Sequence, residues 1–110
     1  MPKMTPYEKG RKMEYKAKQV MESWFGCYVI RSAGSHTPID LICGNGIQVF
    51  AVQVKSEEAK HKVDWDTLRE WSEKFQAIPM LLVMCKGGRV QVYIDGERVY
   101  GEDIDNVIYY

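Results

Sequence analysis

The segment Ile47 to Lys55, which reads I-Q-V-F-A-V-Q-V-K, is the feature that most constrains how this 110-residue chain folds. It is dense in β-branched and aromatic residues, a composition that predicts a central strand. The sequence Gly44-Asn45-Gly46 just before it predicts a tight turn, and Ile39 to Cys43 predicts a short strand before that turn. The other elements must therefore pack around a strand hairpin in the middle of the chain.

A helix is predicted before this hairpin, with Thr5 as its N-cap and Pro6 as its first residue. Apolar residues then recur at the spacing of one buried helical face: Met13, Ala17, Val20, Met21 and Trp24. Gly26 ends the helix, Cys27 to Arg31 forms a strand, and Ser32 to Pro38 forms a polar loop.

A second helix is predicted after Asp64, which serves as its cap. One stripe of that helix holds Trp65, Leu68, Trp71, Ser72 and Phe75. Pro79 separates it from the strand Met80 to Cys85, a turn at Lys86 to Arg89, the strand Val90 to Ile94 and a turn at Asp95-Gly96 toward Val99. The order α-β-β-β-α-β-β predicts one α/β domain over residues 1–110, with a mixed, largely antiparallel central sheet flanked by helices.

Composition excludes several classes of protein. The longest apolar run, Met80 to Cys85, is far shorter than the ~18 residues of a membrane span, and the polar N-terminus does not resemble a secretory signal. The three cysteines have no C-x-x-C spacing and lie in apolar stretches, so we expect buried, reduced thiols in a cytoplasmic protein. With two histidines, a zinc site of ordinary Cys/His spacing is not available.

The zero net charge hides an asymmetry between the two halves of the chain. Residues 1–62 contain ten Lys/Arg and six Asp/Glu, whereas residues 63–110 contain five and nine. A basic half suits an anionic partner held on one side of the molecule. Solvated helices carrying their ordinary charge explain the asymmetry equally well.

Asp40, Gln53 and Lys55 form the constellation with the clearest chemistry. Side chains alternate along a strand, so Gln53 and Lys55 share a face, and a hairpin of this register brings Asp40 beside them. A carboxylate, a neutral oxygen ligand and a lysine suit metal-assisted phosphodiester hydrolysis, in which the lysine orients or helps to deprotonate the attacking water. Each residue alone also fits an ordinary role: an edge charge, a hydrogen-bonded amide and a solvated lysine.

Several motifs in consecutive order resemble the archaeal-type Holliday junction resolvases of the PD-(D/E)XK nuclease superfamily. The matching segments are Y-E-K-G-R-K-M-E (7–14), V-I-R-S-A-G-S (29–35), I-D-L-I (39–42), G-N-G (44–46) and V-Q-V-K-S (52–56). The second half resembles the family only in pattern, through F-x-x-I-P-M-L-L-V (75–83). The resemblance implies a nuclease fold of this superfamily.

The resemblance also implies roles for individual residues. Glu14 and Asp40 match acidic metal-binding positions, and Lys55 matches the catalytic lysine. The implied catalytic set is Glu14, Asp40, Gln53 and Lys55, and the implied metal set is Glu14, Asp40, Gln53 and Val54. The expected cofactor is Mg²⁺, with Mn²⁺ as a substitute.

Contacts with DNA and with a second subunit follow from the same resemblance. Arg31 and Ser35 match residues near the scissile phosphate. Lys9, Gly10 and Arg11 match a segment that lies against the DNA backbone. Lys60 and Lys62 form either a further backbone-contacting patch or a solvated run. Trp71 and Phe75 are expected in the core or at the interface of a homodimer.

The chain departs from the family pattern at two positions. Gln53 stands where the family has Glu, which removes one negative charge from the site, and nucleases of the Mrr restriction type are similar in using Q-x-K. Tyr15 stands where a basic residue often follows the helix-1 glutamate. These departures bear on metal affinity and DNA geometry more than on the type of reaction.

We therefore expect a homodimeric, Mg²⁺-dependent endonuclease that resolves four-way (Holliday) junctions by paired symmetric nicks. It would act without a membrane, in the cytoplasm of an archaeal cell or of a host infected by an encoding virus or phage. The alternatives are a related Mrr-like endonuclease on linear or damaged duplex DNA, and a non-catalytic DNA-binding module.

Overall fold

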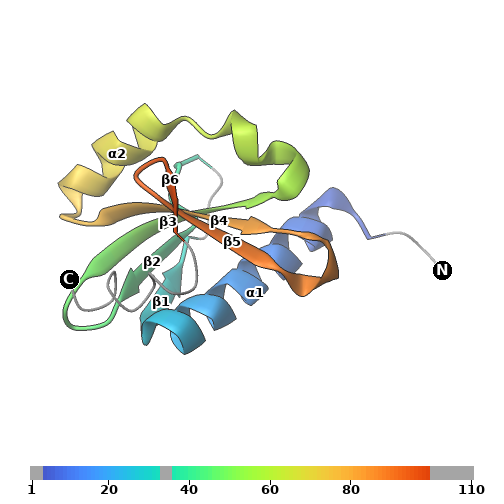
Figure 1. Ribbon diagram of the computed structural model, residues 1–110, viewed down its shortest axis with the longest axis horizontal. Helices are drawn as coiled ribbons and strands as arrows, with labels where there is room; N and C mark the ends of the chain where they lie inside the picture. Colours follow the sequence, from blue (N-terminus) through green and yellow to red (C-terminus); the bar gives the residue numbers. More distant parts are fainter. Residues whose placement is uncertain (1–3, 33–35, 100–110) are drawn as a thin grey trace.

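A six-stranded sheet forms the centre of the protein, and its strands lie side by side in chain order (Figure 1). In this computed structural model, which describes residues 4–32 and 36–99, the strands are β1 (Tyr28–Arg31), β2 (Leu41–Gly44), β3 (Val49–Ser56), β4 (Ile78–Met84), β5 (Val90–Ile94) and β6 (Glu97–Val99). Only β3 and β4 are parallel; every other neighbouring pair is antiparallel. The predicted mixed, largely antiparallel sheet is confirmed.

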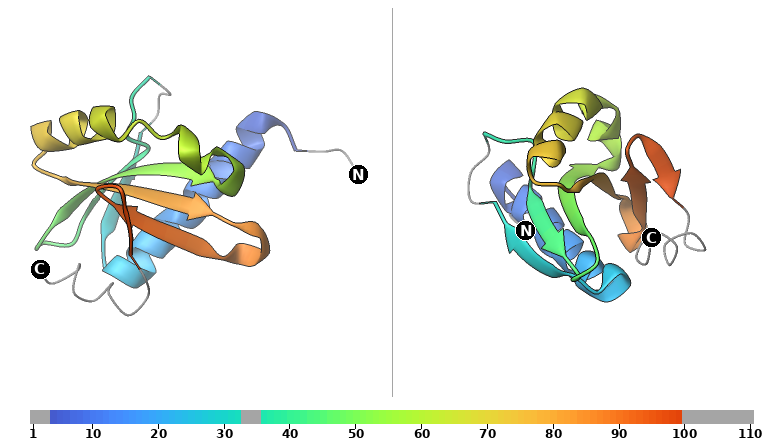
Figure 2. Two further views of the ribbon diagram at one scale, coloured as in Figure 1. Left: turned by 45° about the horizontal axis from the view of Figure 1, so that its top comes forward. Right: turned by 90° about the vertical axis from the view of Figure 1, so that its left-hand side faces the viewer.

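The helices α1 (Pro6–Phe25) and α2 (Trp65–Lys74) cover opposite faces of this sheet, as Figure 2 shows. Strand alternation explains the two layers. Phe50, Val52 and Val54 of β3 lie in the larger apolar cluster with α1, whereas Ala51 lies in a smaller cluster with Leu68 of α2. The face under α2 is therefore the one that Gln53 and Lys55 share with Ala51.

The helix α1 begins and ends as its sequence predicts. The Thr5 hydroxyl accepts a hydrogen bond from the Glu8 N–H at 3.1 Å, and Gly26 adopts a left-handed φ of 64° that ends the helix. The predicted buried position of Trp24 is wrong, because its side chain is 42% exposed. Phe25 is buried instead, since its ring meets that of Phe50 edge to face at 5.5 Å in the last helical turn.

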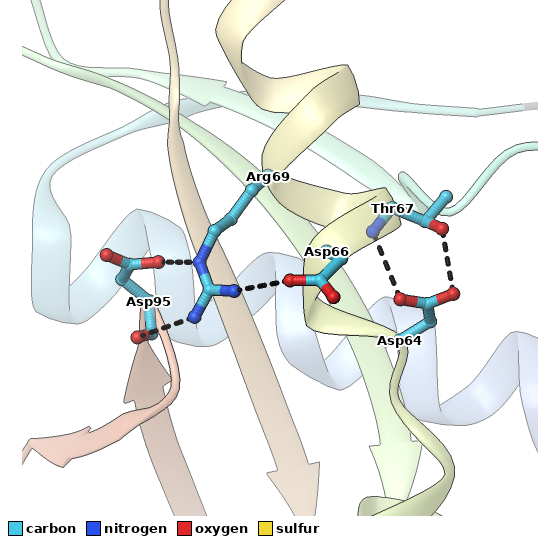
Figure 3. A network of polar contacts seen from close by, with 5 residues as sticks. All are labelled: Asp64, Asp66, Thr67, Arg69 and Asp95. Atoms are coloured by element: carbon cyan, nitrogen blue, oxygen red, sulfur yellow. Dashed lines mark hydrogen bonds and ion pairs between the residues drawn. The ribbon is translucent and has the colours of Figure 1, made fainter.

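The helix α2 is capped by Asp64, whose carboxylate accepts hydrogen bonds from the Thr67 N–H at 3.1 Å and from its hydroxyl at 2.8 Å. Arg69 then links α2 to the turn between β5 and β6 (Figure 3). Its guanidinium donates to the Asp95 carboxylate, to the Asp95 carbonyl at 3.4 Å and to Asp66 at 3.0 Å. These groups are solvent-accessible, so the network orients α2 more than it stabilises the fold.

The structure differs from the predicted arrangement in four places. Glu97–Val99 forms a sixth strand, and the segments η1 (Glu57–Lys62) and η2 (Lys86–Gly88) are short 3₁₀ helices. Pro79 lies inside β4 rather than before it. Its carbonyl accepts from the Asp95 N–H, and the ladder with β5 begins only at Met80, so the missing proline N–H leaves no ladder position empty.

Candidate active site

Asp40 is held against β3 by two hydrogen bonds, one donated by its backbone N–H and one accepted by its carboxylate. Register pairs Leu41 with Val52, and the Asp40 N–H donates to the Val52 carbonyl at 2.8 Å. The Val54 N–H in turn donates to Oδ2 of Asp40 at 2.8 Å. The predicted placement of Asp40 beside the end of β3 is confirmed.

Gln53 follows Val52 on β3, and its side-chain amide is not fully hydrogen-bonded. Oε1 of this amide is buried and has no hydrogen-bond partner within residues 4–32 and 36–99. Leaving such an acceptor unpaired costs about 1–3 kcal/mol. A buried orphan oxygen beside a carboxylate suits a bound cation, which would satisfy both groups.

Glu14 reaches the same region from α1. Its carboxylate forms an ion pair with Arg31, at 3.5 Å between Oε1 and Nε, and both side chains are about one-third exposed or less, at 29% and 35%. Burial raises the pKa of Glu14, the charge of Asp40 raises it further, and Arg31 opposes both effects. The structure therefore brings Glu14, Arg31 and Asp40 together from three separate elements.

Burial makes the negative charge of both carboxyl groups costly. Burial raises the pKa of Asp40, against the hydrogen bond from Val54 and the positive charge of Lys55. Two desolvated carboxylates are costly when ionised, and a bound divalent cation would offset part of that cost.

The donor set fits a hard divalent cation. It consists of two carboxylates and one amide oxygen, and among the described residues no group of three His, Cys, Asp or Glu side chains is placed to hold a metal. Oxygen donors are the ligands that Mg²⁺ prefers. The Val54 side chain is buried in the cluster under α1, so only the backbone of this expected metal-site residue can take part.

With this geometry in view, comparison with protein families matches residues 5–103 to the archaeal Holliday junction resolvases, Hjc. The chain belongs to this family. It is accordingly an endonuclease that acts on Holliday junctions, and nucleases of this family are metal-dependent. The family resemblance predicted from the sequence motifs is confirmed.

A solved structure supports the same fold. The chain is similar to Hjc from Archaeoglobus fulgidus, a Holliday junction resolvase from an archaeal hyperthermophile, with a TM-score of 0.65 and 20% sequence identity. The match covers 79% of this chain and 73% of that chain. The nuclease-like α/β fold is confirmed.

The expected DNA-contacting residues lie mostly at one end of the sheet, where β1 and β3 finish. β2 begins at this end, which places Arg31, Asp40 and Lys55 there. Lys60 and Lys62 follow on η1, and Lys9, Gly10 and Arg11 lie in the first turns of α1, the part of the helix that precedes Glu14. Ser35 lies outside the described residues.

The exposure of two apolar side chains on β1 was not predicted from the sequence. Tyr28 and Ile30 on the edge strand β1 are 90% and 71% exposed. The segment C-Y-V-I-R is apolar at both alternating positions, and this was the available signal that the strand presents apolar groups on both faces. Trp71 and Phe75 of α2 are 36% and 52% exposed, so the predicted apolar stripe is only partly covered.

None of the described helices is both long and apolar enough to span a membrane.

Proposed function

We propose that Glu14, Asp40 and Gln53 bind one Mg²⁺, with Mn²⁺ as a substitute, and that Lys55 serves the attacking water. The observation that carries this proposal is the buried, unpartnered Oε1 of Gln53 beside the fixed carboxylate of Asp40. When bound, such a metal supplies Lewis-acid polarisation of the scissile phosphate and a more acidic water. The backbone carbonyl of Val54 is a further candidate ligand.

In this proposal, the protein's own groups orient the metal ligands, the attacking water and the phosphate. The Val54 N–H donates to Oδ2 of Asp40, which holds the carboxylate in one orientation and leaves Oδ1 for the metal. Lys55 shares the face of Gln53. It lies near enough to Asp40 for its charge to lower the pKa of that carboxyl, although burial raises the same pKa by more. From there its ammonium orients the attacking water as a hydrogen-bond donor, or the side chain in its neutral amine form takes up the water's proton. Arg31 holds Glu14 and presents positive charge toward the phosphate.

We further propose that the chain acts as a homodimer, as a single nuclease domain over residues 1–110. Ile30 pairs with Ile42, which packs with the cluster under α2, so the exposed Tyr28 and Ile30 belong to the sheet face that α2 covers. Trp71 and Phe75 add aromatic surface from α2 itself. Exposed apolar surface of this kind suits contact with a second copy. A two-fold dimer supplies two sites for the two nicks that resolve a symmetric junction.

The cysteines support a location in the cytoplasm of an archaeal cell or of a host carrying an encoding virus or phage. Cys27, Cys43 and Cys85 are all free thiols, as is usual in a reducing compartment. Burial raises the pKa of Cys27 to about 11 and that of Cys43 to about 12, so both are unreactive. The expectation that all three are buried is wrong for Cys85, which is partly exposed after the end of β4.

The test uses a labelled four-way junction and a linear duplex of matching sequence, each with Mg²⁺ or with EDTA. We expect cleavage of the junction only with Mg²⁺, and product mapping should show nicks at symmetric positions on opposite strands. Equal cleavage of the linear duplex would instead support the Mrr-like alternative that the Q-x-K motif keeps open. Junction binding with no cleavage in Mg²⁺ or Mn²⁺ would support a non-catalytic binding module.

A further inference from the structure

A hollow of about 410 Å³ lies between α1 and the end of β4. Its floor is formed by Met13 of α1 and by Met84 and Cys85 at the end of β4. Its rim is formed by Lys9, Lys12 and Lys16, which follow one another along the helix at spacings of three or four residues. The lysine stems can lie on the apolar floor while their ammonium groups stay at the rim.

The connection between β4 and β5 closes the other side of this hollow. The Lys16 ammonium donates to the Gly88 carbonyl at 2.9 Å, which ties α1 to the connection. Gly87 and Gly88 both have left-handed φ values, and a Cβ on Gly88 would meet the Lys16 ammonium at 3.0 Å, so glycine suits this close approach. Arg89 donates from Nε to the Lys86 carbonyl at 3.4 Å, which holds its guanidinium over the connection.

Positive charge outweighs negative charge around the hollow. Lys86 and Arg89 are exposed and add to the three lysines of the rim. Glu58 of η1 lies nearby. Its pKa is lowered first by hydrogen bonds from its own backbone and from Ser56, and then by the charges of Lys9 and Lys86. Glu57, the preceding residue, lies against Cys85 on the floor of the hollow. Five cationic side chains therefore stand against two glutamates at this point.

The hollow lies at the same end of the sheet as the candidate active site. β3 and β4 are parallel and pair Lys55 with Val83 and Ser56 with Met84, so both strands end together. Neighbouring strands are about 5 Å apart, which places the floor of the hollow one strand beyond the lysine of the site. Figure 1 shows η1, the β4–β5 connection and the first turns of α1 gathered at one end of the molecule.

We infer that this hollow, with Lys9, Lys12 and Lys16 on its rim and Lys86 and Arg89 on the adjoining β4–β5 connection, is a second phosphate-binding surface that holds the backbone of a junction arm beyond the cleavage point. The inference rests on the proposed function, because the occupant it names is the DNA on which the site acts. The charge matches a polyanion, and the position matches a duplex that continues past Lys55 at this end of the sheet. Four of the charges, those of Lys12, Lys16, Lys86 and Arg89, extend the contact beyond the DNA-contacting residues predicted from the sequence.

The test compares two double variants that remove equal charge. The rim variant, Lys12→Gln with Lys86→Gln, removes one charge from the rim and one from the β4–β5 connection. The control, Lys18→Gln with Lys74→Gln, removes two lysine charges away from the hollow. Affinity for a labelled four-way junction is measured at several salt concentrations, in an Asp40→Asn background so that no strand is cut. The slope of log affinity against log salt should fall by about two for the rim variant, because each lost phosphate contact removes about 0.9. The control should keep the parental slope.

A second measurement separates binding from chemistry. With Asp40 restored, the single-turnover cleavage rate of the rim variant at saturating protein should stay within about twofold of the parent, because neither residue touches the reacting atoms. An unchanged salt slope, or an equal fall in the control, would overturn this inference and leave the active site intact. A parent protein that neither binds nor cuts the junction would overturn the proposed function and this inference together.

Discussion

At the scale of single residues, Gln53 is the position where the site can be tested most finely. Its Oε1 is buried and has no hydrogen-bond partner among the described residues. Affinity for hard cations depends on ligand charge as well as on ligand number. In the proposed site, the neutral amide therefore trades metal affinity for a smaller repulsion with Asp40 than a glutamate would have.

The variant Gln53→Glu tests this trade directly. We expect it to lower the Mg²⁺ concentration at half-maximal cleavage by about tenfold, since one more carboxylate at about 1.4 kcal/mol corresponds to that factor. The measurement is the cleavage rate against Mg²⁺ concentration, with thermal stability recorded for both proteins. An unchanged midpoint in an equally stable variant would mean that Gln53 is not a ligand, and the site would have to be redrawn around Asp40 and Glu14.

The raised pKa of Asp40 gives a prediction about stability and pH. A carboxyl whose pKa is higher in the folded state binds its proton more tightly there, so ionisation costs stability as pH rises through the folded pKa. In EDTA at neutral pH, Asp40→Asn should therefore melt at a higher temperature than the native protein. The amide oxygen of Asn can still accept from the Val54 N–H.

The difference between the two proteins should shrink as pH falls toward 3.8, the ordinary value, because the native carboxyl then becomes neutral as well. Melting curves between neutral and acidic pH measure this. A native protein that is the more stable of the two at neutral pH without metal would contradict the assignment of a desolvated carboxylate.

At the scale of elements, the attachment of α1 to the sheet decides whether Glu14 reaches Asp40. Phe25 anchors the end of this helix through its edge-to-face contact with Phe50, whereas the neighbouring Trp24 is partly exposed. We expect Phe25→Ala to cost about 3–5 kcal/mol of unfolding free energy, as deletion of a buried aromatic ring usually does. Trp24→Ala should cost under about 1 kcal/mol. Urea denaturation distinguishes the two, and a larger loss for Trp24 would contradict the observed packing.

At the scale of the whole molecule, the exposed side chains Tyr28, Ile30, Trp71 and Phe75 predict a stable homodimer. Light scattering at micromolar concentration in moderate salt should give the mass of two chains. The double variant Ile30→Ser with Trp71→Ser should shift the protein toward the mass of one chain and leave its thermal unfolding cooperative. A native protein that is monomeric under these conditions would count decisively against paired nicks by one assembly.

Much of this arrangement could be predicted from sequence because it is local. The hairpin that places Asp40 beside Gln53 and Lys55 depends on one short turn and on strand alternation, both visible in the sequence. The approach of Glu14 to Asp40 depends instead on the path of α1 across the sheet, and only the family resemblance indicated it. The path of α1 also explains why the predicted burial of Trp24 is wrong. Its spacing fits the buried face, but the last turn of the helix contacts the sheet through Phe25.

Other differences arise from tertiary context that short patterns do not carry. Pro79 is compatible with β4 because the proline N–H falls where no ladder bond is needed, which depends on where the β5–β6 turn lies. The lysines around the 410 Å³ hollow come from α1 and from the β4–β5 connection, so their proximity depends on the complete fold.

The most direct test of the central claim compares binding and cleavage of a four-way junction by Asp40→Asn and Lys55→Ala. Metal ligands and water activation act on the chemical step, whereas affinity comes mainly from phosphate contacts elsewhere. Both variants should bind the junction within about threefold of the native protein, while single-turnover cleavage falls by about a hundredfold or more. A variant that loses binding but retains its cleavage rate per bound complex would contradict the assignment of Asp40 and Lys55 to the chemistry.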